Sequence, residues 1–352
     1  MEGMRSYKLV HFGEALQEIC DSLPTPVGTQ VLIRTRACGV CHSDLHVADG
    51  HFDLGRGQSM DLSRGIALPR TLGHEIAGEV VSCGPEASGL ERGLKCVVYP
   101  WGGCGKCRLC DEGREHLCNR PRNHGLTLDG GYGEYVLVDH PRYLQPIGDL
   151  PDAFAATLAC AGLTAYSALR KADNLGKDSP PLIIGAGGVG SAAINLVQVM
   201  YGVAPAVADI DPAKRQAALN AGAACVVDPA DVEGRKRLLK ETGGGFSAVL
   251  DFVGAAATVE YGLSMVAKGG RLVLVGLFGG AIDLPLPTVP TRGISLIGSY
   301  VGSLTEFGEL VDLARHGKLP RLALQSRPLE QAQQSLDDLR AGRVLGRIVL
   351  VP

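Results

Sequence analysis

The segment Pro180-Pro-Leu-Ile-Ile-Gly-Ala-Gly-Gly-Val-Gly-Ser-Ala-Ala-Ile-Asn195 decides the fold of this chain. A short apolar run, typical of a buried strand, enters a turn of the form Gly185-x-Gly187-x-x-Gly190. A helix pattern follows, with apolar residues at helical spacing: Val189, Ala193, Leu196 and Met200. A glycine motif alone is a weak signal. The strand before it and the helix after it make it typical of a nucleotide-binding βαβ unit.

An acidic residue stands where a dinucleotide-binding fold needs one. Asp209 ends the next apolar stretch, nineteen residues after Gly190. In such folds this carboxylate takes the adenosine ribose hydroxyls, and the helix N-terminus faces the pyrophosphate. Because a carboxylate repels a 2′-phosphate, the sequence predicts NAD rather than NADP.

Strand and helix patterns alternate after Asp209, which favours a parallel, doubly wound sheet. The predicted helices are 214–221, 258–268, 304–316 and 329–341, and the predicted strands are 248–253, 272–277 and 347–351. The first half reads differently: short strands with turns over 5–37, a turn and strand over 130–138, and a helix over 152–172. Segment 47–70 is polar, rich in glycine and weakly periodic, so we predict a long surface loop, with a disordered connector as the alternative.

Composition narrows the function classes. The 352 residues are 45% hydrophobic and 20% charged, enough for two domains with real cores. A net charge of −3 provides no basic field for nucleic acid or an acidic membrane. No apolar stretch reaches ~18 residues and the N-terminus lacks a signal-peptide core, so the sequence predicts a cytoplasmic protein without membrane spans. In that reducing compartment, eleven cysteines favour metal binding or catalysis over disulfides.

Four cysteines crowd one charged, loop-like segment: Cys104, Cys107, Cys110 and Cys118. Closely spaced thiolates are typical of a tetrahedral structural zinc site. Free buried thiols do not suit so charged a segment. An iron–sulfur cluster is the competing interpretation, but the fourth thiol comes after seven residues and no proline follows it. We therefore predict zinc.

The stretch Cys38-Gly-Val-Cys-His-Ser-Asp-Leu-His46 holds two thiols, two imidazoles, a hydroxyl and a carboxylate. These groups suffice to hold a metal, orient its ligands and move a proton. A redox dithiol or a buried small hydrophobe is the alternative for each thiol. His74-Glu75 precedes an apolar strand, and Cys160 lies among small apolar residues. Taken alone, His74-Glu75 and Cys160 would each be interpreted as structural residues.

In combination, these motifs resemble the zinc-dependent medium-chain alcohol dehydrogenases, over essentially the whole chain. They occur in that family's order: Cys41–His46, Gly73–Glu75, the four cysteines, Cys160–Thr164, and Gly185–Gly190 with Asp209. The resemblance implies an α/β fold, with a Rossmann doubly wound parallel sheet domain over 161–302. It also implies a β-rich GroES-like catalytic domain, carrying the structural zinc lobe, over 1–160 with a C-terminal return over 303–352.

The resemblance assigns roles residue by residue. It implies a catalytic zinc on Cys41, His74 and Cys160, with the fourth position left for water or substrate, and a structural zinc on the four clustered cysteines. Ser43 and His46 match the proton relay. Asp44 matches the carboxylate that orients the ligand histidine, and Glu75 a carboxylate that can approach the metal. The implied NAD contacts are His42, Thr164, Gly185, Gly187, Gly188, Val189, Gly190, Asp209, Lys214, Val275 and Arg347. Cys20, Cys38, Cys83, Cys96 and Cys225 match nothing functional.

The implied activity is reversible, NAD-dependent oxidation of an alcohol to an aldehyde or ketone, by hydride transfer from a zinc-bound alkoxide. A polyol or amino-alcohol dehydrogenase of the same fold is one alternative. Cys160 counts against it, because the family's polyol members generally carry an acidic third ligand. A non-enzymatic zinc- and NAD-binding protein is another. The presence of every residue implied as a zinc ligand or as part of the proton relay counts against this second alternative.

Two departures from the family concern substrate and assembly. The chain between His46 and His74 is longer than in the tetrameric yeast-type members, near the opening of their substrate cleft. The short connection from Cys118 to Gly131 resembles those tetramers, so a homotetramer is favoured over a dimer. Tyr99, Pro100 and Trp101 fall where the family has pocket-wall aromatics. We therefore expect a medium-sized primary, cyclic or aromatic alcohol as substrate.

Overall fold

The computed structural model describes residues 3–172, 175–320 and 323–352. The chain divides into two compact units. The first contains Met1–His51, Asp61–Leu163 and Ser303–Pro352, and the second contains Phe52–Met60 and Thr164–Gly302.

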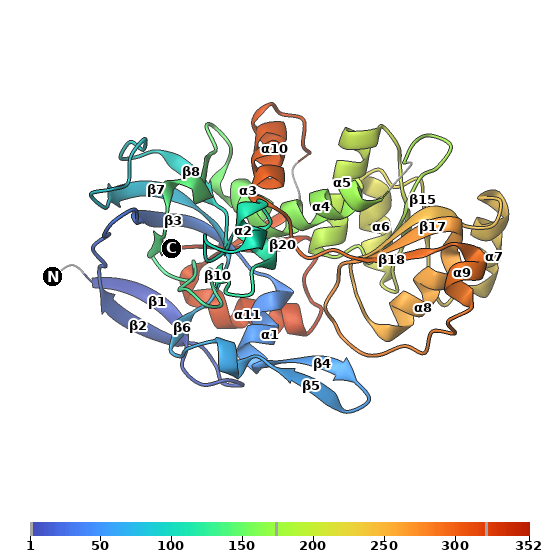
Figure 1. Ribbon diagram of the computed structural model, residues 1–352, viewed down its shortest axis with the longest axis horizontal. Coiled ribbons are helices and arrows are strands. Elements are labelled where there is room, and N and C mark those ends of the chain that lie inside the picture. Colours follow the sequence, from blue (N-terminus) through green and yellow to red (C-terminus); the bar gives the residue numbers. More distant parts are fainter. Residues whose placement is uncertain (1–2, 173–174, 321–322) are drawn as a thin grey trace. The chain divides into compact units, whose positions relative to one another are not determined.

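The first unit is built on a seven-stranded sheet with the order β12-β8-β7-β3-β20-β19, in which β11 also pairs with β3 (Figure 1). Its strands are β3 (Val31–Gly39), β7 (Glu75–Cys83), β8 (Lys95–Val98), β11 (Tyr135–Val138), β12 (Leu144–Pro146), β19 (Leu324–Pro328) and β20 (Arg347–Val351). β3 begins with three buried apolar residues, Val31-Leu-Ile33, whose side chains suit a pleated buried surface. It runs antiparallel to β7 with Gly39 opposite Glu75. The chain segments carrying Cys41 and His74 therefore leave the sheet side by side.

Shorter elements complete this unit. A second sheet joins β2 (Gln17–Ser22), β1 (Gly3–Leu9) and β6 (Arg70–Thr71), and β9 (Trp101–Gly102) pairs with β10 (Arg122–Asn123). The helices are α1 (His42–Asp49), α2 (Arg108–Asp111), α3 (Asp152–Thr157), α10 (Leu304–Arg315) and α11 (Ala332–Arg340). A π turn, Leu158–Gly162, follows α3 directly and leads into α4 (Leu163–Lys171).

The helical stretch Asp152–Lys171 is apolar and long enough to cross a membrane by composition. Of its most apolar window, 89% is buried inside the protein, which is how a core helix behaves.

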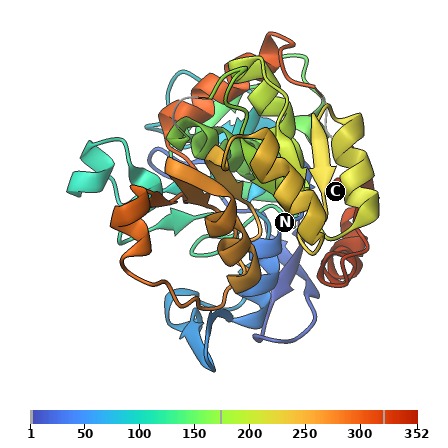
Figure 2. The same cartoon turned by 90° about the vertical axis from the view of Figure 1, so that its right-hand side faces the viewer.

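The second unit is a six-stranded, all-parallel sheet with the order β15-β14-β13-β16-β17-β18, shown from two directions in Figures 1 and 2. Its strands are β13 (Leu182–Ile184), β14 (Ala206–Ala208), β15 (Cys225–Val227), β16 (Phe246–Asp251), β17 (Val266–Leu274) and β18 (Ser295–Gly298). Its helices are α5 (Gly188–Tyr201), α6 (Pro212–Asn220), α7 (Val232–Glu241), α8 (Ala256–Met265) and α9 (Thr288–Arg292), with α4. The strand order reverses beside β13, which is where such sheets bind dinucleotides. The predicted doubly wound sheet is confirmed.

Two predictions from the sequence were wrong. The predicted helix 258–268 ends at Met265, because Val266 already pairs with Phe246 and β17 runs on through Gly269-Gly270 to Leu274. Segment 47–70 is not a long loop: it contains β4 (His51–Gly55), β5 (Gln58–Asp61) and a 3₁₀ turn at Ser63–Gly65. The hairpin turns through positive φ at Gly55, Arg56 and Gly57. Its strands are mostly exposed, so they carry no apolar alternation.

This hairpin packs within the second unit although the chain on both sides of it belongs to the first. The Asp53 carbonyl accepts a hydrogen bond from Gly280 N–H at 3.3 Å, and Arg56 forms an ion pair with Asp283. A side chain at Gly279 would overlap the Asp53 carbonyl oxygen, so the close approach requires glycine there.

Candidate functional site

Four buried donors meet in the first unit: Cys41, His74, Glu75 and Cys160. Their ligand atoms all lie within 4.8 Å of one another. The sulfurs of Cys41 and Cys160 are 4.0 Å apart. Two thiolates on one tetrahedral zinc, at about 2.3 Å each, would be ~3.8 Å apart. The spacing therefore suits a single metal ion.

His74 supports the same conclusion. It is fully buried, and neither ring nitrogen makes a well-aligned hydrogen bond within the described part of the chain. Nδ1 lies 3.2 Å from Asp44 Oδ1, so the carboxylate attracts the ring proton to that nitrogen. With the proton on Nδ1, Nε2 is the nitrogen that would bind a metal ion. Leaving such a buried group without a partner costs ~1–3 kcal/mol. A metal ion at Nε2 would remove that cost, so the residues fit a zinc ion.

Charge around the four donors is arranged for a cation. The hydrogen bond with Cys160, followed by the interactions with His74, holds the pKa of Cys41 well below its ordinary value, which favours the thiolate form. Glu75 is ion-paired with the buried Arg347. Burial raises the pKa of Glu75 to about 7, and Arg347 opposes that rise. A side chain at Gly39 would overlap the Glu75 carboxylate, so this position must be glycine.

Cys160 lies in the π turn Leu158–Gly162. The indole N–H of Trp101 donates to the Ala159 carbonyl in that turn at 3.1 Å. The Trp101 ring also packs against the His74 ring, with centroids 5.0 Å apart. π turns inside helices are frequent at functional sites. Trp101, which we expected in a pocket wall, is buried and touches the segments that carry two of the four donors.

The predicted relay residues lie on α1, directly after Cys41. Ser43 Oγ is 3.8 Å from Cys41 Sγ. His46, further along the helix, is partly buried, and this burial lowers its pKa below the ordinary value. A neutral imidazole near pH 7 is the form that accepts a proton.

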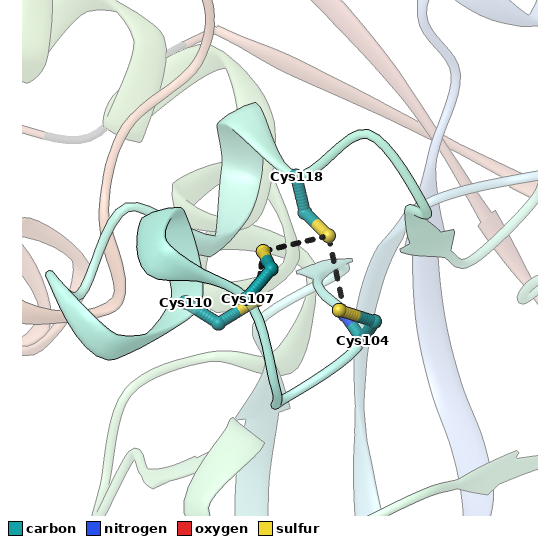
Figure 3. A group of neighbouring side chains, drawn as sticks. All are labelled: Cys104, Cys107, Cys110 and Cys118. Carbon is teal, nitrogen blue, oxygen red and sulfur yellow. Dashed lines mark hydrogen bonds between the residues drawn. The ribbon is translucent and has the colours of Figure 1, made fainter.

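The four clustered cysteines of the first unit form a second group, with sulfurs within 4.8 Å of one another (Figure 3). Cys107 Sγ is 3.6 Å from Cys110 Sγ and 3.7 Å from Cys118 Sγ. These separations again match ~3.8 Å around one zinc. Thiolates on separate irons of a cluster would be spread further apart, so the spacing favours a single ion.

Replacing Cys107 with alanine should reduce bound zinc from two ions per chain to one and lower the thermal unfolding midpoint by roughly 10 °C. Structural zinc contributes folding energy directly, and each kcal/mol lost lowers the midpoint by ~2–4 °C. Metal analysis and a thermal scan measure both effects. Cys20→Ala, an exposed thiol of the same unit, is the control. Retention of both zinc ions in Cys107→Ala would contradict the assignment.

The glycine turn of the second unit has the geometry for close phosphate approach. Gly185 has a φ of 88°, and a side chain at Gly190 would overlap the Gly185 carbonyl. Gly187 caps α5, and the space beside it is open. Asp209 Oδ2 accepts a hydrogen bond from Ala186 N–H at 2.7 Å, so the acid lies against this turn. The structure therefore brings the predicted glycines and Asp209 together.

The other predicted cofactor contacts divide between the units. His42 and Arg347 belong to the first unit, and Thr164, Val189, Lys214 and Val275 belong to the second. Beside Asp209, sequence reasoning missed Arg215. Its guanidinium donates to the Asp209 carbonyl at 2.6 Å and pairs with Asp228 at 3.1 Å. These contacts form only in the folded chain, and no sequence pattern indicated them.

Asp209→Asn should reduce kcat/KM for NAD by roughly 10–100-fold and narrow the preference for NAD over NADP. A hydrogen bond to a charged group contributes ~1.5–3 kcal/mol, and ~1.4 kcal/mol is tenfold. Initial rates with both cofactors measure the ratio. Asp231→Asn removes a helix-capping carboxylate of the same unit and should leave the ratio unchanged. An unchanged ratio in Asp209→Asn would refute the role.

Comparison with known proteins gives consistent matches. Residues 28–149 match the family described as Alcohol dehydrogenase GroES-like domain, and residues 188–316 match Zinc-binding dehydrogenase. An NAD-dependent alcohol dehydrogenase of Sulfurisphaera tokodaii is 38% identical over 351 residues, covering 99% of this chain and 100% of the relative. One of Saccharolobus solfataricus is 37% identical, with 99% and 100% covered.

A solved structure agrees with these matches. The alcohol dehydrogenase of Aeropyrum pernix superposes with a TM-score of 0.89 at 33% identity, over 99% of this chain and 100% of that one. The two domain matches and the full-length relatives agree with the buried donors and the glycine turn described above. This chain therefore belongs to the zinc-dependent medium-chain alcohol dehydrogenase family.

Proposed function

We propose that Cys41, His74 and Cys160 hold the catalytic zinc of this NAD-dependent alcohol dehydrogenase. The observation that carries the proposal is the buried group of donors within 4.8 Å, in which the His74 ring nitrogens lack well-aligned partners in the described chain. Zinc at such a site supplies Lewis-acid chemistry, which makes the alcohol hydroxyl acidic near neutral pH. Cys104, Cys107, Cys110 and Cys118 hold the structural zinc.

The protein's own residues move the proton. Ser43 Oγ accepts it from the alcohol hydroxyl, and His46 passes it towards solvent. Asp44 holds His74 in the tautomer that leaves Nε2 free, and Glu75 with Arg347 balances charge behind the donors.

The glycine turn and the N-terminus of α5 would hold the pyrophosphate of NAD through backbone N–H groups. Asp209 and Lys214 take the adenosine ribose. The remaining contacts proposed are His42, Thr164, Val189, Val275 and Arg347. NAD would supply the hydride acceptor for this oxidation when bound.

An NADH-formation screen tests this function and its substrate. We expect turnover on medium-sized primary, cyclic or benzylic alcohols, with two zinc ions per chain in the same sample. Turnover restricted to polyols would favour a polyol dehydrogenase. Bound zinc and NAD without turnover on any alcohol would favour a protein that has lost its chemistry.

We further propose a homo-oligomer, with a tetramer favoured over a dimer, located in the cytoplasm. β18 is the outermost strand of the parallel sheet and exposes Leu296, while the preceding segment exposes Leu286. An exposed strand edge with apolar side chains supports self-association. Light scattering of the purified protein measures the assembly. The functional domains proposed are 1–160 with 303–352, and 161–302.

A further inference from the structure

The carboxylate of Asp44 is the centre of a buried network. It is fully buried, and three groups donate hydrogen bonds to it. Cys41 N–H reaches Oδ2 at 3.0 Å, Gly73 N–H reaches Oδ1 at 3.3 Å, and the Tyr132 hydroxyl reaches Oδ2 at 2.9 Å. His74 Nδ1 lies 3.2 Å from Oδ1. Tyr132 is the one side-chain hydroxyl in this set, and no role has been given to it so far.

Tyr132 comes from a distant part of the chain, 88 residues after Asp44. It precedes β11 and is fully buried. Its N–H donates to the Leu72 carbonyl at 2.9 Å, and Gly131 N–H donates to the Gly73 carbonyl at 2.8 Å. The Tyr132 segment therefore runs alongside the segment that carries His74, and its backbone fixes where the hydroxyl can point.

The ring of Tyr132 packs directly on Gly73. Gly73 has a φ of 87°, and a side chain there would overlap the tyrosine ring. A phenylalanine ring would fill this space equally well. The hydroxyl is thus separable from the packing, and its one hydrogen bond in the described structure goes to Asp44.

We propose that Tyr132 is a positioning residue for the metal site, because its hydroxyl fixes the Asp44 carboxylate with Oδ1 towards His74. This inference rests on the proposed assignment of His74 as a ligand. With Oδ2 held by Tyr132 and Cys41 N–H, Oδ1 remains directed at Nδ1, which keeps the proton there and Nε2 free. Burial, together with the nearby Asp44 charge, raises the pKa of Tyr132 well above its ordinary value, so the hydroxyl remains a donor.

Tyr132→Phe tests the proposal in the full-length protein. Without the hydroxyl, we expect one of the two zinc ions to pass to a colorimetric chelator ~10–100-fold faster, as is typical when the partner behind a ligand histidine is lost. The second zinc should be released at the wild-type rate. In protein with Co²⁺ at the catalytic site, the visible absorption band should shift, because the histidine ligand is held less firmly.

The matched control is Tyr143→Phe. Tyr143 is also a buried tyrosine whose hydroxyl donates to a buried carboxylate, Glu115, at 2.6 Å. Tyr143→Phe also removes a tyrosine hydroxyl from the first unit, but this hydroxyl is bonded to Glu115 and not to Asp44. We expect unchanged release of the catalytic zinc in this variant.

A double-variant cycle with Asp44→Ala, which removes the acceptor of the Tyr132 hydroxyl, separates positioning from packing. If Tyr132 acts through Asp44, adding Tyr132→Phe to Asp44→Ala should change zinc release no further. Additive effects, wild-type release in Tyr132→Phe, or failure of Tyr132→Phe to fold would each overturn the proposal, since each assigns the hydroxyl another role. Wild-type protein with one zinc per chain would instead overturn the proposed metal site itself.

Discussion

Replacing Cys160 with alanine is expected to lower kcat for alcohol oxidation by about a thousandfold or more and to leave one zinc ion per chain. Without Cys160, only two of the three proposed ligands of the catalytic zinc remain, Cys41 and His74, and two ligands are too few to hold the ion. The Lewis-acid contribution is worth several kcal/mol, and ~1.4 kcal/mol is tenfold in rate. Initial rates and metal analysis of the same preparation measure both effects.

The control for this variant is Cys225→Ala, a partly buried thiol in the second unit that lies in neither group of clustered donors. It should keep both zinc ions and wild-type rates. Thermal unfolding of both variants checks that the fold survives. If Cys160→Ala retained two zinc ions and normal turnover, the third ligand would have to be another residue, and Glu75 is the remaining member of the donor group.

Ser43→Ala should reduce alcohol oxidation by roughly 10²–10⁴-fold while both zinc ions remain bound. A positioned general base contributes an effect of this size, and the serine hydroxyl is the first group on the proposed path. Ser264→Ala, on α8 of the second unit, is the matched control. Wild-type turnover in Ser43→Ala would remove the relay assignment.

The pH dependence of kcat provides a second test of the same proton relay. Burial lowers the pKa of His46 below its ordinary value of 6.5. Below that lowered pKa the imidazole is protonated and cannot accept the proton, so oxidation should fall only at a pH more acidic than an unperturbed histidine would give. His46→Gln should lower the rate and remove this acid limb. If the fall in rate at low pH persisted in His46→Gln, it would arise from the titration of another group.

The doubly wound sheet was predictable because its signals are local. Each buried parallel strand is a short apolar run, and the turn itself requires Gly185 and Gly190. The β4–β5 hairpin was not predictable in the same way. Its strands are exposed on most sides, so nothing in the order of residues distinguishes them from a loop.

The donors of the metal site were recognisable by residue type and order, but their surroundings were not. Trp101 packs on His74 and Tyr132 donates to Asp44 across 88 residues of chain. Such contacts follow from the pairing of β3 with β7 and from the path of the segment before β11. No local pattern at Trp101 or Tyr132 encodes them.

The π turn at Leu158–Gly162 restricts how this chain can change its length. A π turn holds one residue more than the α-helical path, and each residue advances a helix by about 100°. Deleting one residue here would restore regular helical hydrogen bonding but would rotate Cys160 away from Cys41. A shorter, more regular helix and a complete set of thiols are therefore incompatible. Across these five positions, evolutionary drift can proceed by substitution but not by deletion.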